Sequence, residues 1–292
     1  MTYTDLIDAL TKELPSKTLL EWHSSGKLAE ILPEVDVLFG IPQPEAHHPE
    51  IDTGVHVCMV ADYAWTQFKD PAILFAAVCH DLGKGITPQE LWPKHHSHEE
   101  LGLPLVEQVN QRFDVSAEVA RLNELVCVGH LRVHRCMDSR PGSIIQWLEK
   151  EQLLENEPLL LKVLDACEAD ARGRKNLETR PYPQKTFLQK LWHLNPPVES
   201  TREVWLSSYI HRAKLLHAQM KGPEDELSYF PRSCRLPDRY RLAALVGCSP
   251  PWQDRFLLAL HHSRLGQLHC YRYGYMRSYS SSSPVHGTFQ GH

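Results

Sequence analysis

The chain has 292 residues, enough to bury a core in one large domain or two modest ones, and its 42% hydrophobic content is typical of a globular protein. Its net charge is −5, its first ten residues lack the basic start and apolar stretch of a secretory signal, and its longest apolar run, Ile73 to Cys79, is too short to span a bilayer. The eight cysteines are scattered without a CxxC pair, so we expect a cytoplasmic protein with reduced thiols rather than a membrane protein or a disulfide framework.

Helical patterns follow one another through the first 194 residues. Short helices are expected over residues 1–45, and a helix from Gly54 to about Phe68 can be capped by Asp52 or Thr53. The next helix can start at Pro71 and ends in the stretch His80-Asp81. Further helices are predicted over residues 97–112, with Ser97 as the cap, and over 116–131, 144–154, 158–171 and 183–194. Since no strand alternation persists in residues 1–190, we predict an all-α fold, a helical bundle over residues 1–194.

The character of the chain changes after the turn Asn195-Pro196-Pro197. Residues 191–292 carry 12 Lys and Arg against 7 Asp and Glu, whereas residues 1–190 carry 19 against 29. Residues 200–221 can be helical, but beyond Gly222 prolines interrupt the pattern. We therefore expect a basic, partly irregular appendage over residues 195–292, with its last twenty or so residues disordered. A mildly basic tail of this kind is a weak signal for nucleic-acid binding.

Polar residues interrupt the apolar stripe of five different predicted helices. All are of metal-ligating types: His56, the pair His80-Asp81, His98, His130 and Asp170. A single interruption of this kind is usually a core histidine with a hydrogen-bond partner. Five independent ones favour a common metal site inside the bundle.

His80 and Asp81 are the centre of this hypothesis. Adjacent residues project about 100° apart on a helix, so they can hold one ion only near the helix end, where Gly83 and Gly85 open the backbone. Imidazole and carboxylate ligands suit Ni²⁺, Mn²⁺, Mg²⁺, Fe²⁺ or Zn²⁺, and no thiolate pattern indicates a closed structural zinc site. The sequence does not choose among these metals.

Several longer strings now resemble a known family. The order His56, His80-Asp81 and Asp170 is similar to the HD superfamily of metal-dependent phosphohydrolases. The strings that carry a narrower likeness are LPEVD at 32–36, HPEIDTGVH at 48–56, HDLGK at 80–84 and EADARGR at 168–174. These strings resemble the HD half of bacterial multifunctional CCA-adding tRNA nucleotidyltransferases, over roughly residues 10–190. That family has its nucleotidyltransferase head upstream, and this sequence begins just before the HD part, so CCA addition is not expected.

The resemblance implies roles for individual residues. His56, His80, Asp81 and Asp170 would ligate a first metal, and His98 and His130 would hold either a second ion or the substrate. Asp81 would also orient the attacking water. Lys84, Arg172 and Arg174 would neutralise the phosphoryl group, although each can also be a charge at the end of its helix. His95 and His96 are expected at the surface of a loop, and His134 has a weaker case for a site role.

Two functions remain open at this point. The first is a phosphohydrolase of the 2′,3′-cyclic phosphodiesterase, 2′-nucleotidase or phosphatase type, acting on nucleotides or RNA 3′ ends. The second is a tRNA-binding or partner module that works in trans with a separate nucleotidyltransferase and does not need hydrolysis. The sequence leaves the substrate, the metal and the oligomeric state undecided.

Overall fold

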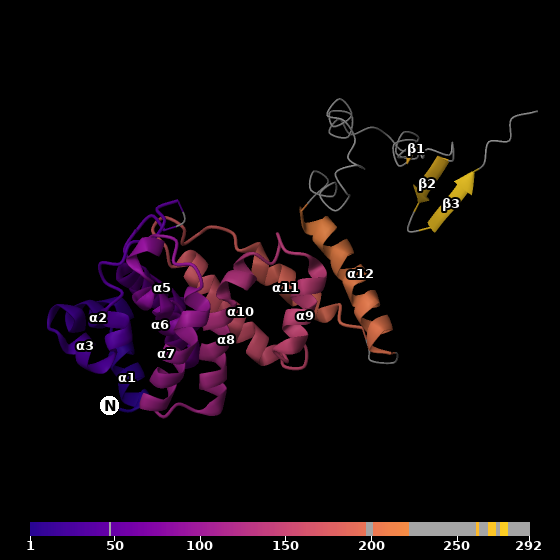
Figure 1. The fold of residues 1–292 in the computed structure, drawn as a ribbon. Coiled ribbons are helices and arrows are strands. Elements are labelled where there is room, and N and C mark those ends of the chain that lie inside the picture. Colours follow the sequence, from indigo (N-terminus) through magenta and orange to yellow (C-terminus); the bar gives the residue numbers. More distant parts are fainter. Residues whose placement is uncertain (47, 197–200, 222–260, 263–267, 273–274, 280–292) are drawn as a thin grey trace, which may run out of the picture. The chain divides into compact units, whose positions relative to one another are not determined.

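The computed structural model describes residues 1–46, 48–196, 201–221, 261–262, 268–272 and 275–279 (Figure 1). The chain divides into two compact units, Met1–Met220 and Lys221–His292. The described part of the first unit is helical, which confirms the predicted all-α class. Its helices are α1 (Tyr3–Thr11), α2 (Pro15–Ser24), α3 (Lys27–Ile31), α4 (Pro33–Asp36), α5 (Thr53–Phe68), α6 (Pro71–Cys79), α7 (His98–Arg112), α8 (Ala117–His134), α9 (Pro141–Lys150), α10 (Glu157–Arg172), α11 (Pro183–His193) and α12 (Arg202–Lys221), with 3₁₀ turns η1 (Leu82–Ile86) and η2 (Gln89–Leu91).

Local capping explains where the long helices start. The Asp52 carboxylate accepts a hydrogen bond from the Val55 amide at the start of α5, and Asp70 accepts one from Ala72 at the start of α6. Ser116 caps α8 in the same way. Such side-chain acceptors satisfy amide groups that have no partner within the helix. Ser97 does not behave as predicted, because its backbone is left-handed and its side chain makes no capping hydrogen bond to α7.

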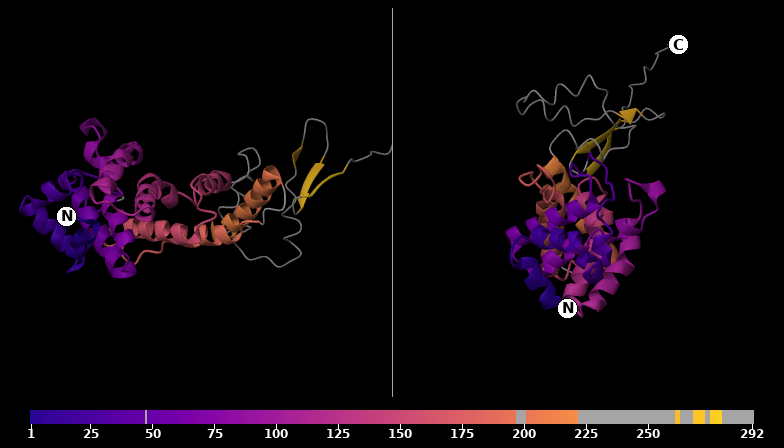
Figure 2. Two further views of the ribbon diagram at one scale, coloured as in Figure 1. Left: turned by 90° about the horizontal axis from the view of Figure 1, so that it is seen from below. Right: turned by 90° about the vertical axis from the view of Figure 1, so that its left-hand side faces the viewer.

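Helix α6 lies at the centre of the helical unit. Every residue from Ala72 to Cys79 is buried, and α6 packs against α5, α8 and α10. A helix that is apolar on all sides must be surrounded by other helices. In the first view of Figure 2 the indigo helices α1–α3 lie at one end of this unit and the orange α12 at the other. Among the described helices, none is both long and apolar enough to traverse a lipid bilayer.

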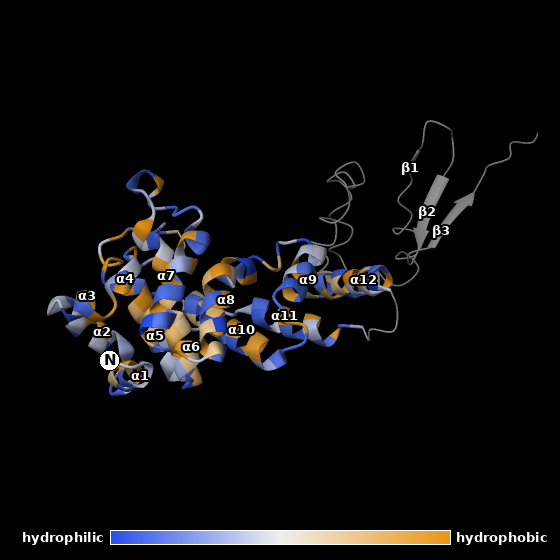
Figure 3. Ribbon diagram, turned by 60° about the horizontal axis from the view of Figure 1, so that its bottom comes forward, coloured by the Kyte–Doolittle hydropathy of each residue, from blue (hydrophilic) through white to orange (hydrophobic). Residues whose placement is uncertain are grey.

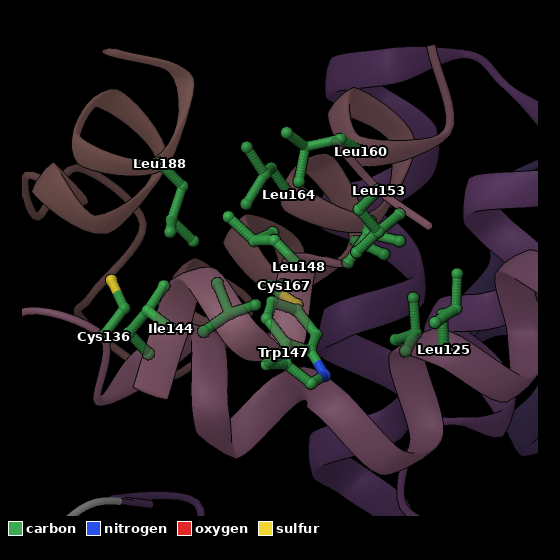
Figure 4. Close-up of a cluster of buried hydrophobic side chains, with 14 of the residues drawn as sticks. Leu125, Cys136, Ile144, Trp147, Leu148, Leu153, Leu160, Leu164, Cys167 and Leu188 are labelled. Atoms are coloured by element: carbon green, nitrogen blue, oxygen red, sulfur yellow. The ribbon is translucent and has the colours of Figure 1, made fainter. Parts of the chain in front are cut away.

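Two clusters of buried apolar side chains form the core. One joins α1–α4 to the faces of α5, α6 and α7, with Leu10, Leu28 and Phe75 among its fully buried members. The other fills the space between α8, α9, α10 and α11, where Trp147 and Leu148 of α9 lie near Leu164 and Leu188 (Figure 4). Of the helices that carry the site described below, α5, α6 and α8 contribute to both clusters, α7 to the first and α10 to the second, so both clusters hold the site in place.

The helical unit extends past the expected boundary at residue 194. Trp205, Tyr209, Ala213 and Leu216 of α12 are buried in the second core cluster. Figure 3 shows both hydrophobic and hydrophilic residues along α12. Helix α9 also differs from the prediction, since it begins at Pro141 and ends at Lys150 instead of spanning 144–154.

The second unit contains a small antiparallel sheet that the sequence analysis did not predict. It consists of β1 (His261–His262), β2 (Leu268–Arg272) and β3 (Tyr275–Tyr279), in the order β1-β2-β3. Where β2 pairs with β3, Cys270 lies opposite Arg277. Strand β3 falls within the stretch expected to be disordered, and the remainder of that stretch lies outside the described residues.

Candidate metal centre

His80 and Asp81 lie where α6 ends. The last residue of α6 is Cys79, His80 caps the helix, and Asp81 precedes the 3₁₀ turn η1. At this junction the two side chains converge, with His80 Nε2 lying 3.0 Å from Asp81 Oδ2. Both residues are about 1% exposed. The change of helix type therefore brings two adjacent residues to one buried point.

A glycine allows α7 to approach this junction. A Cβ atom at Gly83 would lie only 1.9 Å from the His98 carbonyl oxygen, so no larger residue fits between η1 and α7. This close approach brings His98, the first residue of α7, to the Asp81 carboxylate. The distance from His98 Nε2 to Asp81 Oδ1 is 3.2 Å.

Three more helices contribute the remaining candidate ligands. His56 of α5 and Asp170 of α10 face each other, with His56 Nε2 3.1 Å from Asp170 Oδ1. His130 of α8 lies on the other side, with its Nε2 3.3 Å from His98 Nε2. The structure thus brings all six predicted ligands together. Their ligand atoms form two groups, each within 4.8 Å: His56, His80 and Asp170, and Asp81, His98 and His130.

Hydrogen bonds on the outer side fix how the imidazoles face. Three Nδ1 atoms donate to backbone carbonyl oxygens: His80 to Ala77 (2.7 Å), His98 to His95 (2.9 Å) and His130 to Cys127 (3.0 Å). A carbonyl oxygen can only accept, so each Nδ1 carries a proton and each Nε2 faces the cluster. Anchoring of this kind is typical of metal-ligating histidines.

Two buried atoms at the centre of the cluster lack an aligned hydrogen bond within the described part of the chain. They are His80 Nε2 and Asp81 Oδ1. Buried polar atoms without a partner cost free energy, and a divalent cation would satisfy both. The donor set and these two atoms therefore fit a divalent metal.

The protonation states also suit a cation. Burial by itself raises the pKa of Asp81, but the charges of His80 and Lys84 outweigh it and hold that pKa well below its usual range. The pKa of Asp170 is likewise lowered despite burial, chiefly by Arg174. Burial lowers the pKa of His130 to about 3. At neutral pH the cluster therefore offers ionised carboxylates and, at His130, a neutral imidazole, whereas Asp81 and Asp170 raise the pKa of His80 despite its burial.

The three predicted phosphate-binding cations lie in different places. Lys84 is buried, with its Nζ 2.7 Å from Asp81 Oδ2. Arg174 is also in the cluster, where its Nη2 lies 2.8 Å from Asp170 Oδ1. Arg172 is not, and this part of the prediction is corrected. Its guanidinium points toward α5 and the α10–α11 connection, binding the Glu168 carboxylate at 2.9 Å, the Tyr63 hydroxyl at 3.0 Å and the Arg180 carbonyl oxygen at 2.8 Å.

Three residues near the cluster, His134, Glu50 and His95, were undervalued from the sequence. His134 Nε2 lies 2.5 Å from Asp170 Oδ2, and its Nδ1 lies 2.8 Å from the Tyr182 hydroxyl. The sequence signal for His134 was its position one helical turn after the candidate ligand His130. Glu50 Oε1 lies 3.0 Å from His56 Nδ1. His95 was expected at the surface but is 1% exposed, because its ring bridges Thr87 and the Pro42 carbonyl.

Comparisons with known proteins agree with this geometry. Residues 53–170, from the start of α5 to the last candidate ligand, match the HD domain family. The chain carries an HD domain. The HD domain therefore spans the helices from α5 to α10 and includes all six candidate ligands, which confirms the resemblance to the HD superfamily.

The chain is also similar to proteins named multifunctional CCA protein. The protein from Chromobacterium violaceum is 42% identical over 187 residues, which are 64% of this chain and 46% of that protein. The protein from Pseudomonas aeruginosa is 41% identical over 187 residues, again 64% and 46%. The protein from Methylococcus capsulatus is 41% identical over 203 residues, 68% of this chain and 47% of the relative. The chain spans about half the length of the curated relatives it matches.

Proposed function

We propose that this chain is a metal-dependent phosphohydrolase that acts on phosphate esters of nucleotides or RNA 3′ ends. The observation that carries the proposal is the convergence of six buried imidazole and carboxylate groups from α5, the α6–η1 junction, α7, α8 and α10. The likeness to multifunctional CCA proteins supports a link to tRNA processing. The specific reactions proposed are those of a 2′,3′-cyclic phosphodiesterase, a 2′-nucleotidase or a phosphatase.

The ligands divide into two sets in this proposal. His56, His80, Asp81 and Asp170 hold the first divalent metal, which is Ni²⁺, Mn²⁺, Mg²⁺, Fe²⁺ or Zn²⁺. His98 and His130 hold either a second ion or an oxygen of the substrate, and their 3.3 Å separation is compatible with both. A bound divalent metal lowers the pKa of a water to near neutrality and polarises a phosphoryl oxygen.

Side chains of the protein then orient the attacking water and neutralise charge on the phosphoryl group. Asp81 reaches both ligand groups, because its Oδ2 lies near His80 and its Oδ1 near His98. This position suits a carboxylate that orients the attacking water. Lys84 and Arg174 place positive charge beside the two carboxylates, where negative charge develops on the phosphoryl oxygens. Burial strengthens these interactions because the local dielectric constant is low.

The test is a turnover assay on the full chain loaded in turn with Ni²⁺, Mn²⁺ and Mg²⁺. We expect release of phosphate from 2′-AMP or ring opening of 2′,3′-cyclic AMP. Asp81→Asn should abolish the reaction, whereas Asp8→Asn, at an exposed position of α1, should leave it unchanged. No turnover with any of these metals and substrates would refute the proposal.

A second candidate is a tRNA-binding module that works in trans with a separate nucleotidyltransferase. The excess of basic residues after residue 190 and the likeness to CCA proteins favour it. It predicts a gel shift with tRNA that survives Asp81→Asn, in a protein that hydrolyses none of the substrates above. The phosphohydrolase proposal predicts hydrolysis whether or not tRNA binds.

A further inference from the structure

Gln43 is a buried amide side chain that neither the metal centre nor the sequence motifs account for. It lies just before α5, in a short segment held by the bridge between Pro42 and Asp52, and its backbone amide donates to the Ile51 carbonyl at 2.6 Å. Its side chain is 2% exposed. The backbone of Gln43 is therefore fixed by its own hydrogen bonds, which do not explain why its polar side chain is buried.

The Gln43 side chain contacts the metal centre through Lys84. Lys84 Nζ donates to Gln43 Oε1 at 2.5 Å and lies 2.7 Å from Asp81 Oδ2. An ammonium group has three N–H groups and no acceptor, so the amide atom that faces it must be the oxygen. This contact fixes which way round the amide lies.

The orientation leaves one donor unused. Within the part of the chain that the structure describes, Gln43 Nε2 is buried and has no hydrogen-bond partner. Because Nε2 and Oε1 belong to one planar amide, Nε2 lies within a few ångströms of the Lys84 ammonium group. Among the described residues, Lys84 Nζ contacts Gln43 and Asp81, which use two of its three N–H groups, and the third remains close to Gln43 Nε2.

We propose that Gln43 Nε2 and Lys84 Nζ form a pair of donors for an anionic oxygen of the phosphoryl group that the centre acts on. Two adjacent donors, one of them charged, match a phosphoryl oxygen, which accepts several short hydrogen bonds. A neutral carbonyl or hydroxyl oxygen would gain less from this pair than a negatively charged phosphoryl oxygen, so Gln43 and Lys84 together favour phosphate esters. This inference rests on the proposed phosphohydrolase function and adds a substrate-binding residue to it.

The alternative is that Gln43 only clamps the segment before α5 to η1. The variant Gln43→Glu separates these roles, because it keeps an acceptor for Lys84 but removes the N–H donor and adds a charge that repels phosphate. Gln43→Met removes both the acceptor and the donor. Gln108→Met, at an exposed position of α7, is the matched control.

The experiment measures binding of inorganic phosphate to the metal-loaded full chain by calorimetry, with the metal dissociation constant measured on the same samples. We expect both Gln43 variants, saturated with metal, to bind phosphate about tenfold more weakly or worse, with metal affinity unchanged in Gln43→Met and the control like the wild type. In a ¹⁵N-labelled wild-type sample the Gln43 side-chain N–H signals, assigned by their absence in Gln43→Glu, should shift as phosphate is added.

Unchanged phosphate affinity in both variants, or Gln43 signals that do not respond to phosphate, would overturn the inference. The Gln43 side-chain signals are absent from both Gln43→Glu and Gln43→Met, so either variant that folds is enough to assign them, and the labelled wild-type sample then decides the matter. The readout does not depend on turnover. If the chain binds phosphate through Gln43 but hydrolyses none of the substrates, the proposed function fails and this inference stands. If the chain hydrolyses a substrate but Gln43 has no effect on phosphate binding, the proposed function stands and this inference fails.

Discussion

His56 and Asp170 are 114 positions apart in the sequence, yet His56 Nε2 lies 3.1 Å from Asp170 Oδ1. The first is near the start of α5 and the second near the end of α10. Close packing of these helices explains the contact, since a Cβ at Gly173 would lie 2.5 Å from the Val60 Cα atom. The pair therefore depends on the fold as a whole, and removing it should lower both the affinity for metal and the free energy of unfolding.

The first prediction concerns Asp170→Asn. The change removes a charged ligand and takes away the partner of Arg174 and His134. We expect the bound metal, measured by atomic spectrometry after gel filtration, to fall well below the wild-type amount. In the wild type, chelation with EDTA should lower the melting temperature, because a metal at 100 times its dissociation constant contributes about 2.7 kcal/mol. EDTA should have little effect on the variant, and an equal effect on both proteins would contradict the prediction.

The second prediction separates two arginines of similar sequence context. Arg174→Ala removes the guanidinium that holds Asp170, and loss of such a partner typically costs about 10–100-fold in metal affinity or activity. Arg172→Ala removes contacts with Glu168, Tyr63 and the Arg180 carbonyl oxygen, all outside the set of candidate metal ligands, so it should lower the free energy of unfolding by about 1–2 kcal/mol and leave kcat/KM within about twofold. Urea unfolding and steady-state kinetics on both variants test this, and a larger kinetic loss in Arg172→Ala would contradict it.

The two arginines also mark the limit of the sequence analysis. Helical periodicity and caps were enough to predict α5, α6 and α10 and to find ligands on their inner faces. Arg172 is the last residue of α10 and follows the ligand Asp170 by two positions, so the helical period already turns it about 200° away from that ligand. Arg174 lies beyond the helix, where no period says where a side chain points. The same reason hid Glu50 and His95, which lie in connecting segments whose paths are set by contacts with distant residues. Positions fixed by tertiary contacts rather than by a repeat could not be predicted from one sequence.

The third prediction concerns Glu50, whose carboxylate lies 3.0 Å from His56 Nδ1. A carboxylate behind a ligating imidazole orients the ring and makes it a stronger ligand. Glu50→Gln keeps the shape and removes the charge, so we expect the metal dissociation constant to rise about 10–100-fold. Competition with a chromophoric chelator measures it. Glu107→Gln, at an exposed site on α7, is the control, and equal affinities in the two variants would show that Glu50 does not act on the metal.

The fourth prediction concerns stability at high pH. Burial raises the pKa of the Cys136 thiol from 9.0 to about 12. The native state therefore keeps this proton between pH 9 and pH 12, where the unfolded chain has lost it. This contribution to stability is fully present below pH 9 and decreases as the pH rises, by about 1.4 kcal/mol per pH unit. Urea unfolding at pH 8.5, 9.5 and 10.5 should show a shallower decline for Cys136→Ala than for the wild type, and parallel declines would contradict the assignment.

The last prediction concerns where the helical unit ends. Helix α12 buries Trp205 and Tyr209 in the second core cluster, and the Tyr209 hydroxyl donates to the Leu191 carbonyl at 2.8 Å. A chain ending at residue 194 would leave the partners of these side chains exposed. Since loss of one large buried aromatic side chain costs about 3–5 kcal/mol, that chain should be less stable by at least this amount than one ending at residue 221.

Urea unfolding of the two shortened chains tests this directly. Tyr209→Phe in the longer chain is the finer probe, because it keeps the ring and removes only the hydroxyl. It should cost about 1 kcal/mol, from the hydrogen bond and the unpaired Leu191 carbonyl. Equal stability of the chains ending at residues 194 and 221 would mean that α12 is dispensable and that the boundary inferred from sequence composition, at residue 194, is the physical one.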